Sequence, residues 1–299
     1  MTNGRFLESP YTRYVRHLAG LLPQGIYNGR AERKRPATPT QASSEFLINR
    51  RLGDWAEDTI RQSVMSSTNY VVVKYGRARD TVAGEPGFKE SFEMYQDELD
   101  RFGKRPDLLI FRRQDYSLST PDLSESDDSE VAGIVRRAIA AIEVRSSNYL
   151  TRRYVPGKSS RFPELSFTIK VEDLHIVMTW VQNTGVPHYY AQVTLDEVHA
   201  IGFHKALLIL SNPNNENARY SIKRVPKNQF KTTLNIPFSQ GVKIGDITED
   251  PSIDAVRREL PSGRLLFYVK FSGGTLTPIP GIWEKVFLEA ERIKQNPAD

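Results

Sequence analysis

Two carboxylates in the middle of the chain could together carry out chemistry. Asp107 stands in the apolar stretch RPDLLIF (105–111), and Glu143 lies towards the end of another, AIAAIEVRSS (138–147). Short apolar stretches of this kind are typical of buried strands. If the two strands are adjacent, both carboxylates can reach one hard divalent cation, because Mg²⁺ favours carboxylate oxygens and retains water. Such an ion can hold a phosphodiester, polarise it and lower the pKa of an attacking water.

A structural role is the alternative for each acid. Asp107 can cap a turn, and Glu143 can pair with a nearby arginine, which is the usual role of isolated acids in such places. The elements that surround the two strands therefore decide between the two interpretations.

Helix and strand patterns alternate along the chain. Ala56 and Ile60 belong to an apolar series at the spacing of one helical face, which predicts a helix over about 44–65, with Ser43 or Ser44 as its cap. The other expected elements are strands at 69–76, 105–111, 138–147, 188–195, 199–212 and 263–272 and helices near 88–102, 169–185 and 281–294. Alternation of this kind predicts an α/β fold with a mixed central sheet flanked by helices.

The order of these elements resembles the PD-(D/E)XK nuclease pattern. RPDLLIF followed by AIEVRSS carries the motif strand by strand, and GDWAE (53–57) resembles the acid-bearing helix that precedes it in many members. The stretch FTIKVEDLHIVMTWVQNTGVPHYYAQVTLDEVHAIGF resembles the corresponding part of type II restriction endonucleases of the AccI type. The resemblance spans residues 44–210.

This resemblance implies a restriction-endonuclease-like core and Mg²⁺-dependent hydrolysis of double-stranded DNA that leaves 5′-phosphate ends. Family members usually act as homodimers that read short palindromic sites, and we expect a protein of the bacterial cytoplasm. Asp107 and Glu143 would bind Mg²⁺, and Glu57 on the preceding helix would support the site. Glu57 can instead be a solvated helix residue beside Asp58 and Arg61.

The last position of the motif departs from the family. It is normally lysine, but here it is Arg145. Arginine is planar, bulkier than lysine and does not readily lose a proton, so the exchange is not conservative. Arg145 can still neutralise the charge that develops on the phosphate. Lys170, at the expected start of the helix near 169–185, can take the place of the missing amine, and both possibilities remain open.

The positive charge of the chain is concentrated in a few places. Lys and Arg number 41 against 36 acids, which gives a formal net charge of +5. The stretch 115–130 contains six acids and no base, so the rest of the chain is more basic than this figure suggests, and we expect that stretch to be a solvated, mobile connector. Basic residues gather at 30–35, 145–161 and 219–231, as in surfaces that contact DNA phosphates and base edges, or in ordinary solvated loops. The expected DNA contacts are Arg152, Arg153, Lys158, Arg161, Arg219, Lys223, Arg224, Lys227, Asn228, Gln229 and Lys231.

We divide the chain into three parts. Residues 1–42 form a basic arm, expected to be loosely packed or ordered by a partner, although a short amphipathic stretch around Val15 lies within it. Residues 43–212 form the nuclease core. Residues 213–299 complete the same domain or form a small subdomain with further DNA contacts.

Several classes of protein are excluded by composition. The chain has no cysteine, which excludes disulfides, thiolate zinc sites and cysteine nucleophiles. It shows neither a secretion signal nor an apolar window long enough to span a bilayer, so we expect a soluble protein with no membrane partner. Two alternatives to a restriction endonuclease remain: a structure-selective repair or phage nuclease, and a catalytically inactive DNA-binding protein with a nuclease-like core.

Overall fold

A mixed sheet forms the centre of the molecule. The computed structural model describes residues 8–24, 26, 35–77, 81–116, 122–155, 164–212, 214, 219–225 and 228–297. The sheet has seven strands in the order β1-β2-β3-β5-β6-β9-β12. These strands are β1 (Tyr70–Lys74), β2 (Leu108–Arg112), β3 (Ala140–Ser146), β5 (His188–Val193), β6 (Glu197–Gly202), β9 (Val242–Ile247) and β12 (Leu276–Pro278). Within it β3 and β5 are parallel and every other pair is antiparallel, so the predicted mixed sheet is confirmed.

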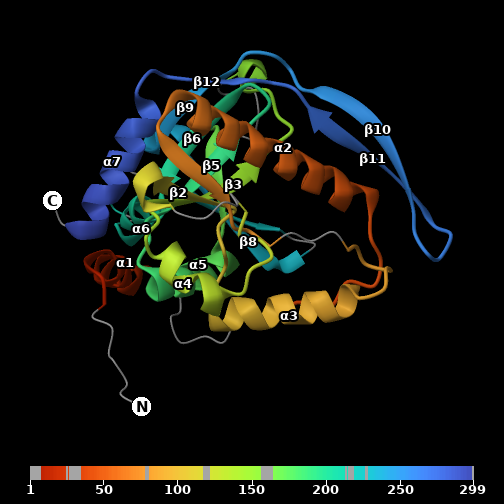
Figure 1. Cartoon of the computed structure of the whole chain (residues 1–299), viewed down its shortest axis with the longest axis horizontal. Coiled ribbons are helices and arrows are strands. Elements are labelled where there is room, and N and C mark those ends of the chain that lie inside the picture. Colours follow the sequence, from red (N-terminus) through yellow and green to blue (C-terminus); the bar gives the residue numbers. More distant parts are fainter. Residues whose placement is uncertain are drawn as a thin grey trace.

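Helices cover both faces of this sheet (Figure 1). Successive residues of a strand point to opposite faces, and in β2 Leu109 packs in one apolar cluster while Leu108 packs in the other. The first cluster includes residues of α1 (Pro10–Gly20), α4 (Asp128–Val135), α5 (Val171–Thr184) and α6 (Phe203–Ser211). The second includes residues of α2 (Ser44–Ser67), and α7 (Ile282–Gln295) packs there too. The predicted α/β class is therefore confirmed.

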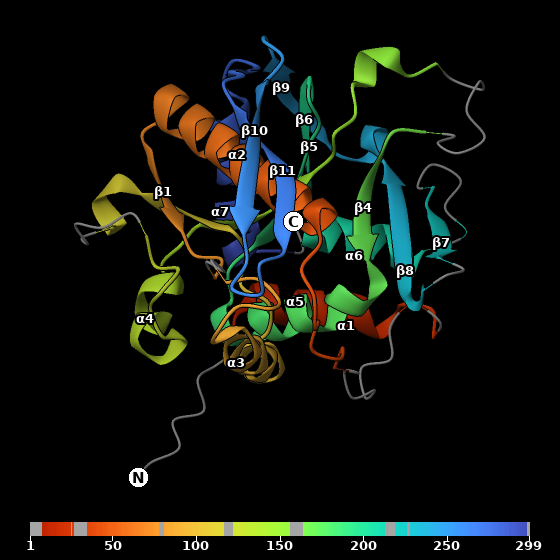
Figure 2. The ribbon, with the colours of Figure 1, turned by 90° about the vertical axis from the view of Figure 1, so that its right-hand side faces the viewer.

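Two smaller sheets lie beside the main one (Figure 2). One has the order β4-β8-β7 and consists of β4 (Ser166–Lys170), β7 (Ser221–Val225) and β8 (Asn228–Pro237). The other is the hairpin of β10 (Ser252–Glu259) and β11 (Leu265–Ser272), which packs against α2. The remaining elements are α3 (Phe88–Arg101) and the short 3-10 helices at Arg113–Asp115, Thr151–Arg153 and Phe238–Gln240.

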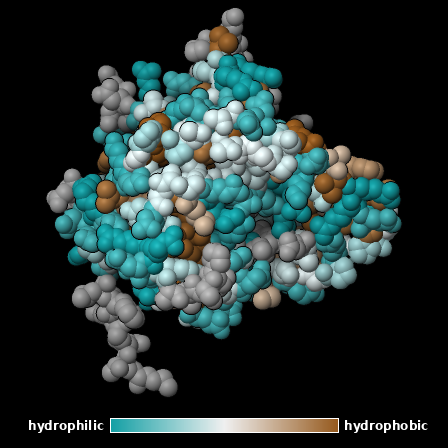
Figure 3. All heavy atoms as spheres, turned by 45° about the horizontal axis from the view of Figure 1, so that its top comes forward, coloured by the Kyte–Doolittle hydropathy of each residue, from teal (hydrophilic) through white to brown (hydrophobic). Residues whose placement is uncertain are grey.

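The surface is mostly hydrophilic on the face that Figure 3 shows. Hydrophobic side chains form small patches there, and the patch on the right lies over the β10–β11 hairpin, where Ile253 and Phe267 are exposed. Among the described residues, no helix combines the length and the apolar character that crossing a membrane requires.

Most of the predicted elements are present. The helix predicted at 44–65 is α2, and the hydroxyl of Ser43 caps it by accepting from the main-chain N–H of Phe46 (3.1 Å). The prediction for 199–212 was wrong in its second half, because the strand ends at Gly202 and α6 follows. Ala206 and Leu210 are buried there at helical spacing, which a continuous apolar run conceals.

Two predictions of loose structure also need correction. Residues 10–20 are not loosely packed: they form α1, whose Tyr11 and Val15 are fully buried against the sheet and its helices. The acidic stretch 115–130 includes the start of α4, and Asp128 is buried in an ion network described below. In both cases long-range packing determines the structure, and local composition does not reveal it.

Candidate active site

Asp107 lies directly before β2 and faces the middle of β3. Leu108 pairs with Ile142 in antiparallel register, which sets Asp107 opposite Glu143. Its carboxylate Oδ2 accepts a hydrogen bond from the main-chain N–H of Val144 (2.6 Å). Its carbonyl accepts from the N–H groups of Tyr75 (2.9 Å) and Gly76 (3.2 Å) at the end of β1. Asp107 is thus fixed by the two strands on either side of it.

Glu143 is buried in the middle of β3, with 3% of its surface exposed. Its Oε1 forms an ion pair with Lys104 and lies 3.4 Å from a guanidinium nitrogen of Arg145. Its Oε2 is also buried, and no described residue gives it a hydrogen bond. One oxygen of this carboxylate therefore faces protein cations and the other is available to a ligand.

Two residues of this site were not predicted from the sequence. Lys104 follows α3, three positions before Asp107, and Asp173 lies in the first turn of α5. Asp173 Oδ2 is 2.8 Å from a guanidinium nitrogen of Arg145 and 3.6 Å from Lys104 Nζ. The adjacency of Lys104 to the PD motif, and of Asp173 to Lys170, were the available signals.

The charges around the two carboxylates act on them unequally. Burial and the nearby charge of Glu143, opposed by Lys104, together raise the pKa of Asp107 to about 7. Burial alone would raise the pKa of Glu143, but Lys104 and Arg145 bring it below its usual value. The same two cations overcome burial at Asp173 and lower its pKa to about 2. Glu143 and Asp173 thus carry negative charge. The charge of Glu143 repels that of Asp107 and makes ionisation of Asp107 less favourable.

Glu57 faces the same region from α2. Burial and the charge of Asp107 raise the pKa of Glu57 to about 9, with smaller contributions from Asp54 and Glu143. Among the described residues, no group of three or more histidine, aspartate or glutamate side chains is arranged to hold a metal ion. Glu57 is therefore near enough to act on Asp107 electrostatically, while its role as a metal ligand stays a prediction.

A divalent cation suits this pair of carboxylates. Glu143 Oε2 is buried without a partner, and no described residue donates a hydrogen bond to Asp107 Oδ1. A Cβ added at Gly76 would lie 3.1 Å from that same Oδ1, so a side chain there would crowd this oxygen. Mg²⁺ commonly binds through one or two carboxylates and keeps several waters, which fits two carboxylates without a third ligand.

The remaining predicted site residues occupy different places. Lys170 is exposed at the end of β4 and contributes to the low pKa of Asp173. Arg152 and Arg153 are exposed in the 3-10 helix after β3, and Arg152 pairs with Asp250 (2.9 Å). Arg219 is exposed just before β7, and Lys223 is exposed within β7. Outside the described residues or side chains lie Lys158, Arg161, Arg224, Lys227, Asn228, Gln229 and Lys231.

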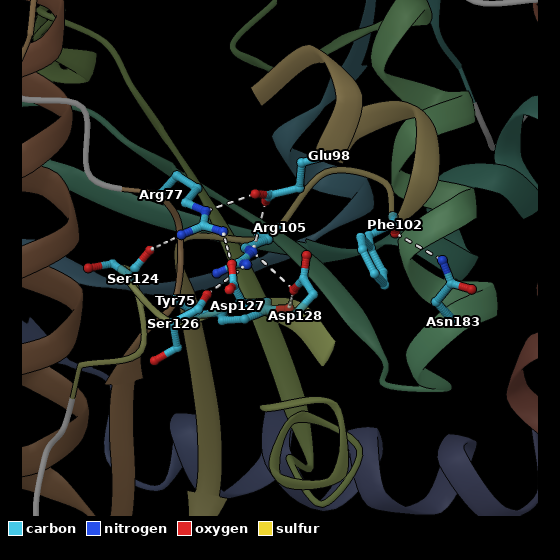
Figure 4. Close-up of polar contacts among 10 residues, drawn as sticks. All are labelled: Tyr75, Arg77, Glu98, Phe102, Arg105, Ser124, Ser126, Asp127, Asp128 and Asn183. Carbon is cyan, nitrogen blue, oxygen red and sulfur yellow. Dashed lines mark hydrogen bonds and ion pairs between the residues drawn. The ribbon is translucent and has the colours of Figure 1, made fainter. Parts of the chain in front are cut away.

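Arg105, the residue that follows Lys104, belongs to a buried ion network (Figure 4). Arg105, whose side chain is 2% exposed, lies 2.8 Å from Glu98 and 3.0 Å from Asp128. It also donates to the carbonyl of Ser126 (3.0 Å), and its guanidinium stands over the ring of Tyr75. This network ties the acidic stretch to α3 and to the segment that carries Lys104 and Asp107.

Comparison with known proteins adds one match. The sequence model of the family described as AccI restriction endonuclease matches residues 9–164 and 158–279. No match appears among curated proteins or among solved structures. The matched residues include the three acids Asp107, Glu143 and Asp173. They also include the two cationic residues Lys104 and Arg145.

Proposed function

We propose, because this chain belongs to the AccI restriction endonuclease family, that it is a type II restriction endonuclease that hydrolyses double-stranded DNA with Mg²⁺. The observation that carries the proposal is the pairing of Asp107 and Glu143 across β2 and β3, each with one carboxylate oxygen left for a ligand. When bound, Mg²⁺ would supply the positive charge that polarises the phosphodiester and lowers the pKa of the attacking water.

The residues of the chain would divide the remaining work. Asp107 and Glu143 hold the cation, with Glu57 as a supporting carboxylate, and the cationic side chains beside Glu143 stabilise the negative charge of the phosphate. The water oxygen forms a bond to phosphorus as the bond to the 3′-oxygen breaks. One proton of the water ends on the 3′-oxygen, and the other stays on or leaves the new 5′-phosphate. The products are 5′-phosphate and 3′-hydroxyl ends.

Binding to DNA would come from the exposed basic residues. Arg153 and Lys223 are exposed on segments that follow β3 and precede β8, and such side chains contact phosphates. We also propose that two protomers act on one duplex, because a palindromic site has two-fold symmetry and two strands to cut.

Digestion of a plasmid with Mg²⁺ tests this function. Discrete, reproducible bands are expected, and Asp107→Ala should reduce cleavage by about 10²–10³-fold, as loss of one catalytic group does. DNA binding by Asp107→Ala in EDTA should persist. Asp246→Ala, which removes an exposed carboxylate at the end of β9, is the matched control and should cleave normally.

Other outcomes would favour the alternatives. A smear in place of bands indicates a nuclease without sequence selectivity. Tight, salt-sensitive binding without any cleavage by the wild-type protein indicates an inactive DNA-binding protein. Full activity of Asp107→Ala would show that the proposed metal site is wrong.

A further inference from the structure

The motif position that usually carries the active-site lysine is occupied by Arg145, which pairs with two acids of the site. Its guanidinium is 2.8 Å from Asp173 and 3.4 Å from Glu143. Both contacts use the same terminal nitrogen, and the planar guanidinium is bulkier than an ammonium and does not readily lose a proton, so it is a poor substitute for the usual lysine. The compact cation that contacts Glu143 is instead Lys104, which comes from outside the motif.

The position of Lys104 is fixed through its main chain. Its N–H donates to the carbonyl of Ile176 in α5 (2.9 Å). Gly103, directly before it, has a φ of +88° and lies so close to α5 that a Cβ would be 2.3 Å from the Ile176 carbonyl oxygen. Only glycine combines this backbone conformation with this approach. The segment after α3 is therefore packed tightly against α5.

Residues after Lys104 fix the segment from the other side. Arg105 is buried in its ion network with Glu98 and Asp128 (Figure 4), and Asp107 is bound to β1 and β3. A lysine flanked by such contacts on both sides has little freedom except in its own side chain. That side chain is 18% exposed, so it is mostly buried but still reaches solvent.

We propose that Lys104 is the catalytic lysine of this enzyme, that is, the ammonium group that contacts the attacking water or a phosphate oxygen. The proposal rests on the proposed nuclease function. An ammonium has three N–H donors. The hydrogen bond to Glu143 engages one of them, while Asp173 at 3.6 Å forms only an ion pair, so donors remain available for the substrate. Arg145 then acts by holding Asp173 in place, and Arg105 is a positioning residue for Lys104.

Absence of cysteine from the chain permits a direct test. Lys104→Cys introduces the one thiol of the protein, and 2-bromoethylamine converts that thiol to an aminoethyl thioether, which restores an ammonium at nearly the same place. We expect Lys104→Cys to lose about 10²–10³-fold in single-turnover cleavage and to retain DNA binding in EDTA. Aminoethylation should restore at least about a tenth of wild-type cleavage, whereas iodoacetamide, which adds a neutral amide, should restore none.

Controls separate this role from a structural one. Lys89→Cys, at a 71% exposed side chain on α3, should cleave normally before and after either reagent. Mass spectrometry establishes complete modification, and thermal unfolding establishes the fold. If Lys104→Cys does not fold, the unfolded chain is aminoethylated and refolded, and Lys104→Met provides the uncharged comparison. The same reagents on Lys170→Cys test the alternative lysine.

Each outcome is informative. Wild-type protein that does not cleave DNA overturns the nuclease function itself. Wild-type protein that cleaves while Lys104→Cys or Lys104→Met cleaves within about threefold of it overturns only the role of Lys104. A fully aminoethylated, folded protein that remains inactive overturns it too, and loss and rescue at Lys170 in place of Lys104 would assign the role to Lys170.

Discussion

Each of the two central carboxylates divides its oxygens between the protein and a ligand. Asp107 uses Oδ2 to accept from Val144, and Glu143 uses Oε1 to contact Lys104. These contacts orient the carboxylates before any ligand arrives. They do not neutralise the pair, because the charge of Glu143 still raises the pKa of Asp107. A cation between the two free oxygens would relieve that repulsion, so it should bind the folded protein and stabilise it.

We therefore predict that Mg²⁺ raises the melting temperature in the absence of DNA. A ligand that binds only the folded state at about a hundred times its Kd stabilises by about 2.7 kcal/mol. Asp107→Asn should abolish this shift, since it keeps the shape of the side chain and removes the charge. Thermal unfolding followed by circular dichroism measures both proteins with Mg²⁺ and with EDTA.

The control for this measurement is Asp246→Asn, which removes an exposed carboxylate paired with Lys243. It should retain the full Mg²⁺ shift. An equal shift in Asp107→Asn would mean that the ion stabilises the protein elsewhere.

Of the individual residues of the site, only some could be predicted from the sequence. Asp107 and Glu143 could be found because each stands at an apolar strand, and the register of β2 and β3 places them opposite each other. Lys104 and Asp173 could not be found in this way, because neither stands in a recognisable motif. They reach the site only through the packing of the α3–β2 connection against α5.

The element that most depends on tertiary structure is the connection from α3 to β2. Its Arg105 is nearly fully buried, and the two acids around it belong to α3 and α4. A buried ion pair contributes little compared with an apolar pair of the same shape, but the loss of one partner is costly because it leaves uncompensated buried charge. The network therefore specifies where the connection lies.

We predict that Arg105→Ala lowers the free energy of unfolding by about 3–5 kcal/mol, because Glu98 and Asp128 lose their buried cation. Arg35→Ala is the matched control, since Arg35 pairs with Asp97 and Asp100 of the same helix at the surface. Its effect should be much smaller and should vanish at high salt. Urea unfolding at low and high salt measures both, and similar losses for the two variants would refute a special role for the buried network.

Elements in which apolar residues recur at a regular spacing were predicted well. Elements whose structure depends on burial in the folded protein were not. The helix α2 and its Ser43 cap follow from local spacing. The division of 199–212 into β6 and α6 does not, because Gly202 separates two apolar runs that look continuous. The polar composition of the acidic stretch predicted a solvated segment. Asp128 is instead buried, where it pairs with Arg105 and accepts a hydrogen bond from Tyr75.

For the whole molecule, the distribution of charge is more informative than its sum. The net charge of +5 is modest, and many cations are already paired with acids, as Arg152 is with Asp250. Arg153 and Lys223 are exposed, and they lie within the basic clusters at 145–161 and 219–231. If these clusters bind DNA phosphates, each contact releases counterions, so its loss should change the salt dependence of binding.

We predict that Arg153→Ala and Lys223→Ala each weaken DNA binding uniformly across sequences and reduce the slope of log K against log salt concentration by roughly 1. Fluorescence anisotropy with a labelled duplex in EDTA, from low to moderate salt, measures this slope without cleavage. Lys285→Ala, at an exposed position of α7 outside the basic clusters, should leave it unchanged. Slopes in the first two variants equal to that of the wild type would show that DNA is bound by another surface. A loss of affinity for one sequence only would instead make the residue a reader of bases.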